Sequence, residues 1–225
     1  MNLPPDLRNR VLQAVQQHPA APRPVARRRR LAAGGLTVIV YVALLAAIGL
    51  APDDPRPDGH VLTTAVGLVA LALGALLVSL RRGSTMTGPP VGVRLAFLGG
   101  GVAGWALLLG ALYAAWPETT ALESPRPLPL GCWLLTLLFA AAPLTLLVVL
   151  RRGAEAVSPG ATAATVSLAA ALAGTLGATL HCPYAGLVHQ LVGHGLPLVA
   201  LTALGAWALA PWLSVRRGQV PGPRR

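Results

Sequence analysis

The segment that decides the fold runs from Val61 to Gly83 and reads VLTTAVGLVALALGALLVSLRRG. Its apolar part carries no ionisable side chain, and a helix of about 20 apolar residues is long enough to cross the hydrocarbon core of a bilayer. Two arginines and a glycine end it, which places cations at the negative end of the helix dipole and a residue suited to a left-handed cap beyond them. We interpret the segment as a transmembrane helix with a cytoplasmic end.

Five other apolar segments of similar length accompany this one. The six predicted spans are 31–51, 61–80, 95–116, 128–150, 160–181 and 191–213. The second, fourth and sixth are each followed by two arginines and a glycine, so the spans pair into three hairpins. Only 11% of the residues are charged, whereas soluble domains carry about a quarter. The sequence therefore predicts an all-α, polytopic membrane protein.

The arginines predict the orientation of these helices. Of 18 arginines, only Arg56 and Arg126 lie in the first, third and fifth loops; the others lie in the two tails and the alternate loops. Positive charge next to a span resists translocation, so both termini are predicted to be cytoplasmic. The predicted parts are a tail over 1–30, a bundle over 31–215 and a second tail over 216–225. Because the net charge of +11 is confined to short segments, we predict no direct binding of nucleic acid.

The N-terminal tail contains a helical repeat of apolar residues. Leucine or valine recurs every four residues over 3–17, at Leu3, Leu7, Val11 and Val15, with Leu12 beside them. This spacing predicts a short amphipathic helix, with Arg8 and Arg10 among its polar residues. Such a helix is marginal alone in water, so another surface must cover its apolar side. Anionic lipid headgroups and an apolar groove on a soluble protein both fit the pattern.

Two cysteines are predicted at the outer face. Cys132 begins the fourth span and Cys182 follows the fifth, so in antiparallel neighbours both thiols reach a similar depth. A disulfide requires their Cα atoms to lie within roughly 7 Å. His181, His189 and His194 occupy the same region and are candidate metal ligands, although their spacing matches no compact zinc motif. A disulfide, a mixed metal site and inert cysteines all stay open, and we predict no resident cofactor or metal.

Other functional classes find little support in the sequence. A transporter or channel needs polar groups at mid-membrane, and no span has an acidic residue, a basic residue or a histidine in its middle third. A membrane thiol-redox protein is the alternative that the two cysteines allow, but such enzymes use closely spaced pairs, and these two are fifty residues apart. No phosphate loop or nucleophile motif is present. We predict that the chain is not an enzyme.

Three groups of residues point to a known family. They are Leu3-Pro4-Pro5-Asp6-Leu7 in the tail, Cys132 leading a span that ends in Leu150-Arg151-Arg152-Gly153, and His181-Cys182-Pro183. With six spans, the chain resembles the NrsF/CarR-like family of bacterial membrane anti-sigma factors over nearly its whole length. The resemblance implies a negative regulator of transcription in the bacterial inner membrane, whose tail sequesters an extracytoplasmic-function sigma factor. A stress signal sensed by the bundle or its outer face would release that factor.

The resemblance also implies roles for individual residues. The expected sigma-binding residues are Leu3, Leu7, Arg8, Val11, Leu12 and Val15. Cys132 and Cys182 are the pair associated with sensing. The last outer loop departs from the family pattern, because residues 184–193 contain no acidic residue and His189 and His194 occur instead. The sequence therefore does not identify the signal, the particular sigma factor or the oligomeric state.

Overall fold

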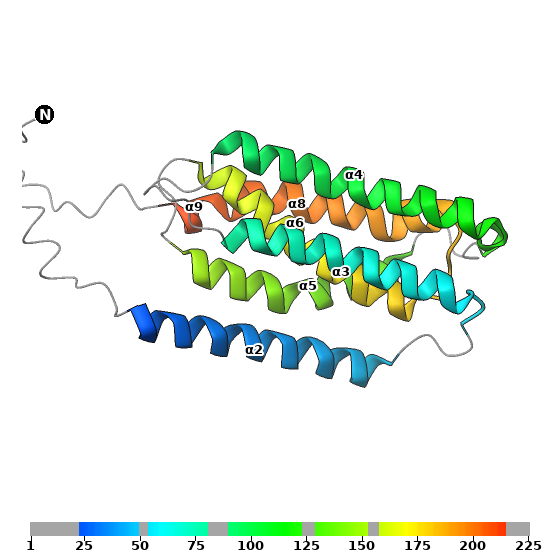
Figure 1. Cartoon of the computed structure of the whole chain (residues 1–225), viewed down its shortest axis with the longest axis horizontal. Coiled ribbons are helices and arrows are strands. Elements are labelled where there is room, and N and C mark those ends of the chain that lie inside the picture. Colours follow the sequence, from blue (N-terminus) through cyan, green and yellow to red (C-terminus); the bar gives the residue numbers. More distant parts are fainter. Residues whose placement is uncertain (1–22, 50–53, 81–89, 123–128, 153–157, 215–225) are drawn as a thin grey trace, which may run out of the picture. The chain divides into compact units, whose positions relative to one another are not determined.

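The structure is a computed structural model that describes residues 23–49, 54–80, 90–122, 129–152 and 158–214. These residues contain no β-strand, so the predicted all-α class is confirmed. The elements, labelled in Figure 1, are α2 (Arg23–Ile48), α3 (Asp58–Leu80), α4 (Val91–Ala115), η1 (Pro117–Ala121), α5 (Leu130–Arg151), α6 (Pro159–His181), α7 (Leu187–His189), η2 (Gln190–Gly195), α8 (Leu196–Ala208) and α9 (Ala210–Leu213).

The chain divides into two units, Met1–Leu36 and Thr37–Arg225, and the boundary falls within α2. In the first unit the described part is helical from Arg23, so α2 begins eight residues before the predicted span. The predicted amphipathic helix at 3–17 lies outside the described residues and stays a prediction. The helices from α3 onward belong to the second unit.

Five helical segments in the described ranges are long and apolar enough to cross a membrane. They are Asp58–Ser79, Val91–Ala115, Leu130–Arg151, Pro159–His181 and Leu187–Ala208. They correspond to the second through sixth predicted spans, which are thereby confirmed as long apolar helices. The first predicted span corresponds to α2, whose apolar part, Gly34–Ile48, is shorter. The complete six-span topology therefore stays a prediction.

The last predicted span differs from the single helix expected over 191–213. It begins at Leu187, passes through the π-helical turn η2, continues as α8 and bends at Leu209 before α9. Pro197 has no backbone N–H, so the hydrogen-bond ladder cannot continue regularly through the preceding turn. Pro211 similarly lies in the first turn of α9. The π-helical turn brings His194 to the same end of the bundle as Cys132 and Cys182.

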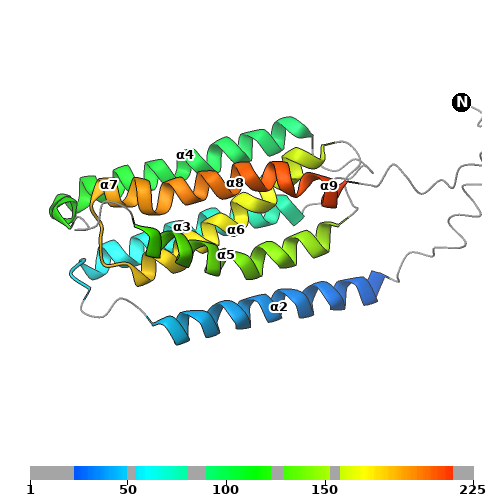
Figure 2. The same ribbon diagram turned by 180° about the vertical axis from the view of Figure 1, so that it is seen from behind.

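Helix α6 lies at the centre of the second unit. It contacts α3, α4, α5 and α8, which surround it in Figures 1 and 2. Of its apolar window, 83% is buried, whereas no other span exceeds 28%. Alanine, glycine, serine and threonine make up most of its residues, and small side chains allow neighbouring helices to approach closely. The exterior is apolar instead, with large side chains such as Leu107, Leu134 and Trp207 exposed, as expected for a surface that faces lipid.

Two glycines of α6 set its distance from α5. A Cβ atom on Gly174 would overlap the carbonyl oxygen of Thr136, and one on Gly177 would overlap the ring of Phe139. These contacts support the interpretation that small residues serve packing within the bundle. They also bring the start of α5 and the end of α6 together, which positions Cys132 beside Cys182.

Candidate functional site

Three segments of the chain bring a cluster of sulfur and imidazole groups to one end of the bundle. Cys132 lies in the first turn of α5, which begins after Pro129. Cys182 ends α6, and its N–H donates to the carbonyl oxygen of Thr179 at 3.3 Å. His189 ends α7 and His194 lies in η2. The four residues are therefore supplied by α5, α6 and the start of the last span.

The reactive atoms of this cluster are close together. The Sγ atoms of Cys132 and Cys182 are 3.6 Å apart. His189 Nε2 lies 3.4 Å from the sulfur of Cys132 and 3.1 Å from that of Cys182. With one ring nitrogen of His194, all four donor atoms lie within 4.8 Å of one another. We call Cys132, Cys182, His189 and His194 the Cys/His cluster.

The Cys/His cluster is mostly buried, but a cavity opens beside it. Cys182, His189 and His194 are buried, and Cys132 is half-buried. A cavity of about 420 Å³ adjoins them, lined by residues that include Cys132, His181 and Tyr184. The cavity gives a small ion or oxidant a route to the two sulfur atoms.

The surroundings of Cys182 favour its ionised form. The thiol of Cys132 donates a hydrogen bond to the sulfur of Cys182, and this lowers the pKa of Cys182. Burial raises that pKa, but the nearby imidazoles of His189 and His194 act with Cys132 to lower it. The thiolate is the form of cysteine that reacts as a nucleophile and binds metals. The cluster can therefore perform either thiol chemistry or metal coordination.

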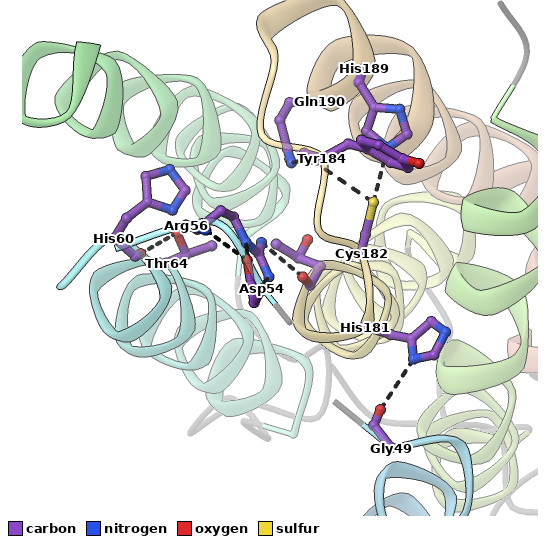
Figure 3. A network of polar contacts seen from close by, with 11 residues as sticks. Gly49, Asp54, Arg56, His60, Thr64, His181, Cys182, Tyr184, His189 and Gln190 are labelled. Atoms are coloured by element: carbon purple, nitrogen blue, oxygen red, sulfur yellow. Dashed lines mark hydrogen bonds and ion pairs between the residues drawn. The ribbon is translucent and has the colours of Figure 1, made fainter. Parts of the chain in front are cut away.

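Hydrogen bonds hold the segment that carries the two histidines. The Gln190 side chain donates to the carbonyl oxygen of Tyr184 at 2.9 Å, as Figure 3 shows. The indole N–H of Trp133 in α5 donates to Val192 at 2.9 Å, and the hydroxyl of Tyr113 in α4 donates to Ala185 at 2.7 Å. The histidine-bearing segment is thus fastened to two neighbouring helices.

A second polar network joins the end of α6 to the end of α2. The ring of His181, next to Cys182, donates from Nδ1 to the carbonyl oxygen of Gly49 at 3.2 Å, as Figure 3 shows. Gly49 follows α2 directly and has a φ of 83°, which glycine adopts without strain. The end of α2 therefore touches the residue that precedes one of the cluster cysteines.

Arg56 makes a second polar contact with the end of α6. Its buried guanidinium donates to the carbonyl oxygen of Thr179 at 3.0 Å and pairs with the Asp54 carboxylate at 2.5 Å. Burial raises the pKa of Asp54, but the hydrogen bonds and charge of Arg56 outweigh it and hold this pKa below its usual value. The hydrogen bond to Thr179 fastens the segment before α3 to the last turn of α6, and the ion pair with Asp54 holds the guanidinium in place for it.

Comparison with known proteins assigns the chain to a family. The family model described as NrsF, negative regulator of sigma F, matches residues 14–214. The chain belongs to the NrsF family. The match includes all the described helices and the Cys/His cluster, whereas Leu3 to Leu12 of the tail precede it. No curated protein and no solved structure matches the chain.

Within this NrsF chain, the structure shows which of the residues singled out in the sequence lie close together. It brings together Cys132, Cys182, His189 and His194. His181 lies outside the cluster, which corrects its place among the candidate ligands, because its ring is directed to Gly49. The sigma-binding candidates from Leu3 to Val15 fall outside the described residues.

Sequence reasoning missed the network around Gly49, Asp54 and Arg56. The only local signal was an arginine among the acidic residues of an outer loop, a position where positive charge is uncommon in this chain. Its partners on α6 are more than a hundred residues away in sequence. No pattern in the chain pairs residues at that separation.

Proposed function

We propose that the chain is a membrane-bound anti-sigma factor whose N-terminal tail holds an extracytoplasmic-function sigma factor, and that a signal at the outer end of the bundle releases it. Membership of a family of negative regulators of sigma F carries the sigma-factor part of this proposal. The five long apolar helices and the apolar exterior support a location in the membrane.

The distribution of arginine supports a location of the tail and the Cys/His cluster on opposite sides of that membrane. Arg151 ends α5 at the predicted cytoplasmic face, whereas Cys132 begins the same helix. At about 1.5 Å per residue these two residues are roughly 28 Å apart along the helix axis. A signal at the cluster must therefore act on the tail through the helices.

The tail would act by covering a surface of the sigma factor. An apolar side formed by Leu7, Val11 and Val15 fits an apolar groove, in the mode by which amphipathic helices bind soluble partners. Arg8 and Arg10 would meet acidic side chains at the rim of that groove. The bound tail blocks surface that the sigma factor needs for RNA polymerase, and the membrane tether keeps it away from DNA.

The end of α2 provides the route from the cluster to the tail. Helix α2 is continuous from Arg23 to Ile48 and follows the tail directly in the chain. At the other end of α2, Gly49 accepts a hydrogen bond from His181, which is the residue directly before Cys182. A chemical change at Cys182 that displaces His181 would alter the position of α2. The signal must favour one state over the other, because equal binding to both shifts no equilibrium.

A pull-down tests the proposed function. Tagged full-length chain and a version lacking residues 1–30 are recovered from membranes of uninduced cells, and the bound proteins are identified by mass spectrometry. We expect one sigma factor with the full-length chain and none with the truncated chain. Recovery of no sigma factor, or equal recovery with both chains, would contradict the assignment to the tail.

His181→Ala should weaken repression if α2 conveys the signal. Loss of the N–H donor frees the carbonyl oxygen of Gly49, so we expect several-fold higher activity of the target promoter without any inducer. His181→Asn retains an N–H donor at a similar position and should keep part of the repression. Immunoblots of the membrane fraction check that the variants are present in equal amounts. Wild-type repression by His181→Ala would argue against coupling through Gly49.

The thiol-redox alternative rests on the 3.6 Å separation of the two sulfur atoms. Closure to a disulfide would transfer two electrons and two protons to an external disulfide, which becomes two thiols. Repeated turnover needs an exchange partner, and the chain contains only these two cysteines. We therefore propose a regulatory rather than an enzymatic role for the pair.

A further inference from the structure

His194 is the member of the Cys/His cluster whose burial is not balanced by hydrogen bonds. Its side chain is fully buried, and neither ring nitrogen meets the distance and angle of a hydrogen bond to a described residue, although the sulfur of Cys182 is near the ring. A buried polar group without a partner is destabilising, because it has lost its hydrogen bonds to water. One of these nitrogens lies within 4.8 Å of the donor atoms of Cys132, Cys182 and His189. The arrangement therefore lacks a partner that all four groups could share.

The separations among the donor atoms of Cys132, Cys182 and His189 are close to those around a tetrahedral metal ion. With zinc bonds of about 2.3 Å to sulfur and 2.05 Å to nitrogen, tetrahedral geometry places two sulfurs roughly 3.8 Å apart and a sulfur and a nitrogen roughly 3.6 Å apart. The corresponding distances here are 3.6 Å between sulfurs, and 3.4 and 3.1 Å from the sulfurs to His189 Nε2. A disulfide would need the sulfurs at about 2.05 Å.

We propose that Cys132, Cys182, His189 and His194 form a binding site for one divalent zinc-like ion. Two thiolates and two imidazoles are ligands that select zinc over magnesium or calcium, which prefer oxygen. Binding releases the thiol protons, and the two thiolates neutralise the charge of the ion in a buried site. The ion would also supply the missing partner of His194.

The local backbone explains how the second histidine reaches this site. His189 and His194 are five residues apart, and the π-helical turn places i and i+5 in register, where a regular α-helix would align i and i+4. Their ring centroids are 5.5 Å apart. Gly193 makes room for the ring of His189, because a Cβ there would lie 3.3 Å from His189 Nε2 and 3.2 Å from Pro129 Cγ. The cavity beside Cys132 gives the ion access.

A bound ion would connect α5, α6 and the last span at their outer ends. If the proposed anti-sigma function holds, the metal-bound form is the one that retains the sigma factor, because the ion fixes Cys182 and with it the adjacent His181 contact to Gly49. Removal of the ion, or oxidation of its thiolate ligands, would then free that connection. This regulatory consequence rests on the proposed function, whereas metal binding does not.

Cobalt binding tests the site directly. The full-length chain in detergent, kept reduced and stripped of metal with a chelator, is titrated with Co²⁺. We expect intense visible bands of tetrahedral cobalt and a sulfur-to-cobalt charge-transfer band, saturating at one ion per chain and abolished by Zn²⁺. Excess Mg²⁺ or Ca²⁺ should leave the spectrum unchanged. Absence of the tetrahedral bands from folded wild-type chain would overturn the proposal.

Single substitutions assign the ligands. Cys132→Ser, Cys182→Ser, His189→Ala and His194→Ala should each weaken Zn²⁺ binding by more than about 100-fold, the upper range for loss of a group that only supports a ligand. His60→Ala is the matched control, because it removes another buried histidine, in the first turn of α3 and outside the cluster, and it should bind as wild type does. Wild-type affinity in His194→Ala, or lost affinity in His60→Ala, would contradict the assigned set.

A second measurement uses wild-type chain and so does not depend on whether the substituted chains fold. In wild-type chain, Zn²⁺ should slow alkylation of Cys132 and Cys182 at least tenfold, whereas Mg²⁺ should not, and equal rates would overturn the proposal. Chelator treatment of membranes tests the regulatory consequence, with loss of the bound sigma factor expected. Unchanged retention would overturn that consequence alone, because the cobalt spectrum is measured without any sigma factor.

Discussion

Replacing both Leu7 and Val11 with aspartate should abolish retention of the sigma factor at the membrane. Burial of each leucine- or valine-sized side chain contributes about 1.5–3 kcal/mol, so loss of both weakens binding by roughly 3–6 kcal/mol, or about 150- to 25,000-fold. The new carboxylates would also have to enter an apolar groove, which adds to the loss. Quantitative pull-down and activity of the target promoter measure the effect.

The matched control places the same charges on the other side of the predicted helix. Asn9 and Gln13 lie opposite Leu7 and Val11 on a helical wheel, so Asn9→Asp with Gln13→Asp changes the net charge equally without touching the apolar side. This control should retain most of the bound sigma factor. Full repression by the Leu7→Asp, Val11→Asp chain would remove the tail helix from the mechanism, and equal loss in both variants would show that charge alone is responsible.

The second large effect is expected at Gly174. A methyl group there would overlap the backbone oxygen of Thr136, and a backbone atom cannot move aside as a side chain can. We expect Gly174→Ala to destabilise the bundle by about 1–3 kcal/mol, the usual cost of overpacking, and to separate the outer ends of α5 and α6. Thermal unfolding in detergent, followed by circular dichroism, measures the first change. Slower disulfide formation between Cys132 and Cys182 in oxidised glutathione reports the second.

Gly110→Ala is the control for this substitution. Gly110 also lies within a long helix, but a Cβ there would have no atom within 4 Å. Alanine has the higher helix propensity, so this variant should be as stable as wild type or up to about 1 kcal/mol more stable. The proposed approach of α5 to α6 would be contradicted if both alanine variants melted at the wild-type temperature.

Local patterns explain why much of the fold was predictable. The length of an apolar segment and the absence of charge within it are properties of neighbouring residues, and they predicted five long helices to within a few positions. The first expected span is less well determined, because the basic residues from Arg27 to Arg30 precede a shorter apolar stretch within α2. The irregular start of the last span was missed, because its π-helical turn depends on backbone hydrogen bonds rather than on apolar periodicity.

The candidate site was predictable only in part, for a related reason. The constant rise of a helix predicted that Cys132 and Cys182 lie at similar depth, which their 3.6 Å separation bears out. It could not distinguish among three histidines at that depth. His181 occupies the last turn of α6 and is directed to Gly49, whereas the π-helical turn directs His194 to the sulfurs.

The sequence by itself determined the helical class, the positions of the apolar helices and the family. Those properties follow from composition and from the order of residues along the chain. Only the tertiary structure decided that α6 occupies the centre, because the helix richest in small residues packs best against several neighbours while the more apolar helices face outward. The same packing decided which histidines meet the cysteines, since contacts between residues up to 62 positions apart depend on how helices pack and not on local sequence.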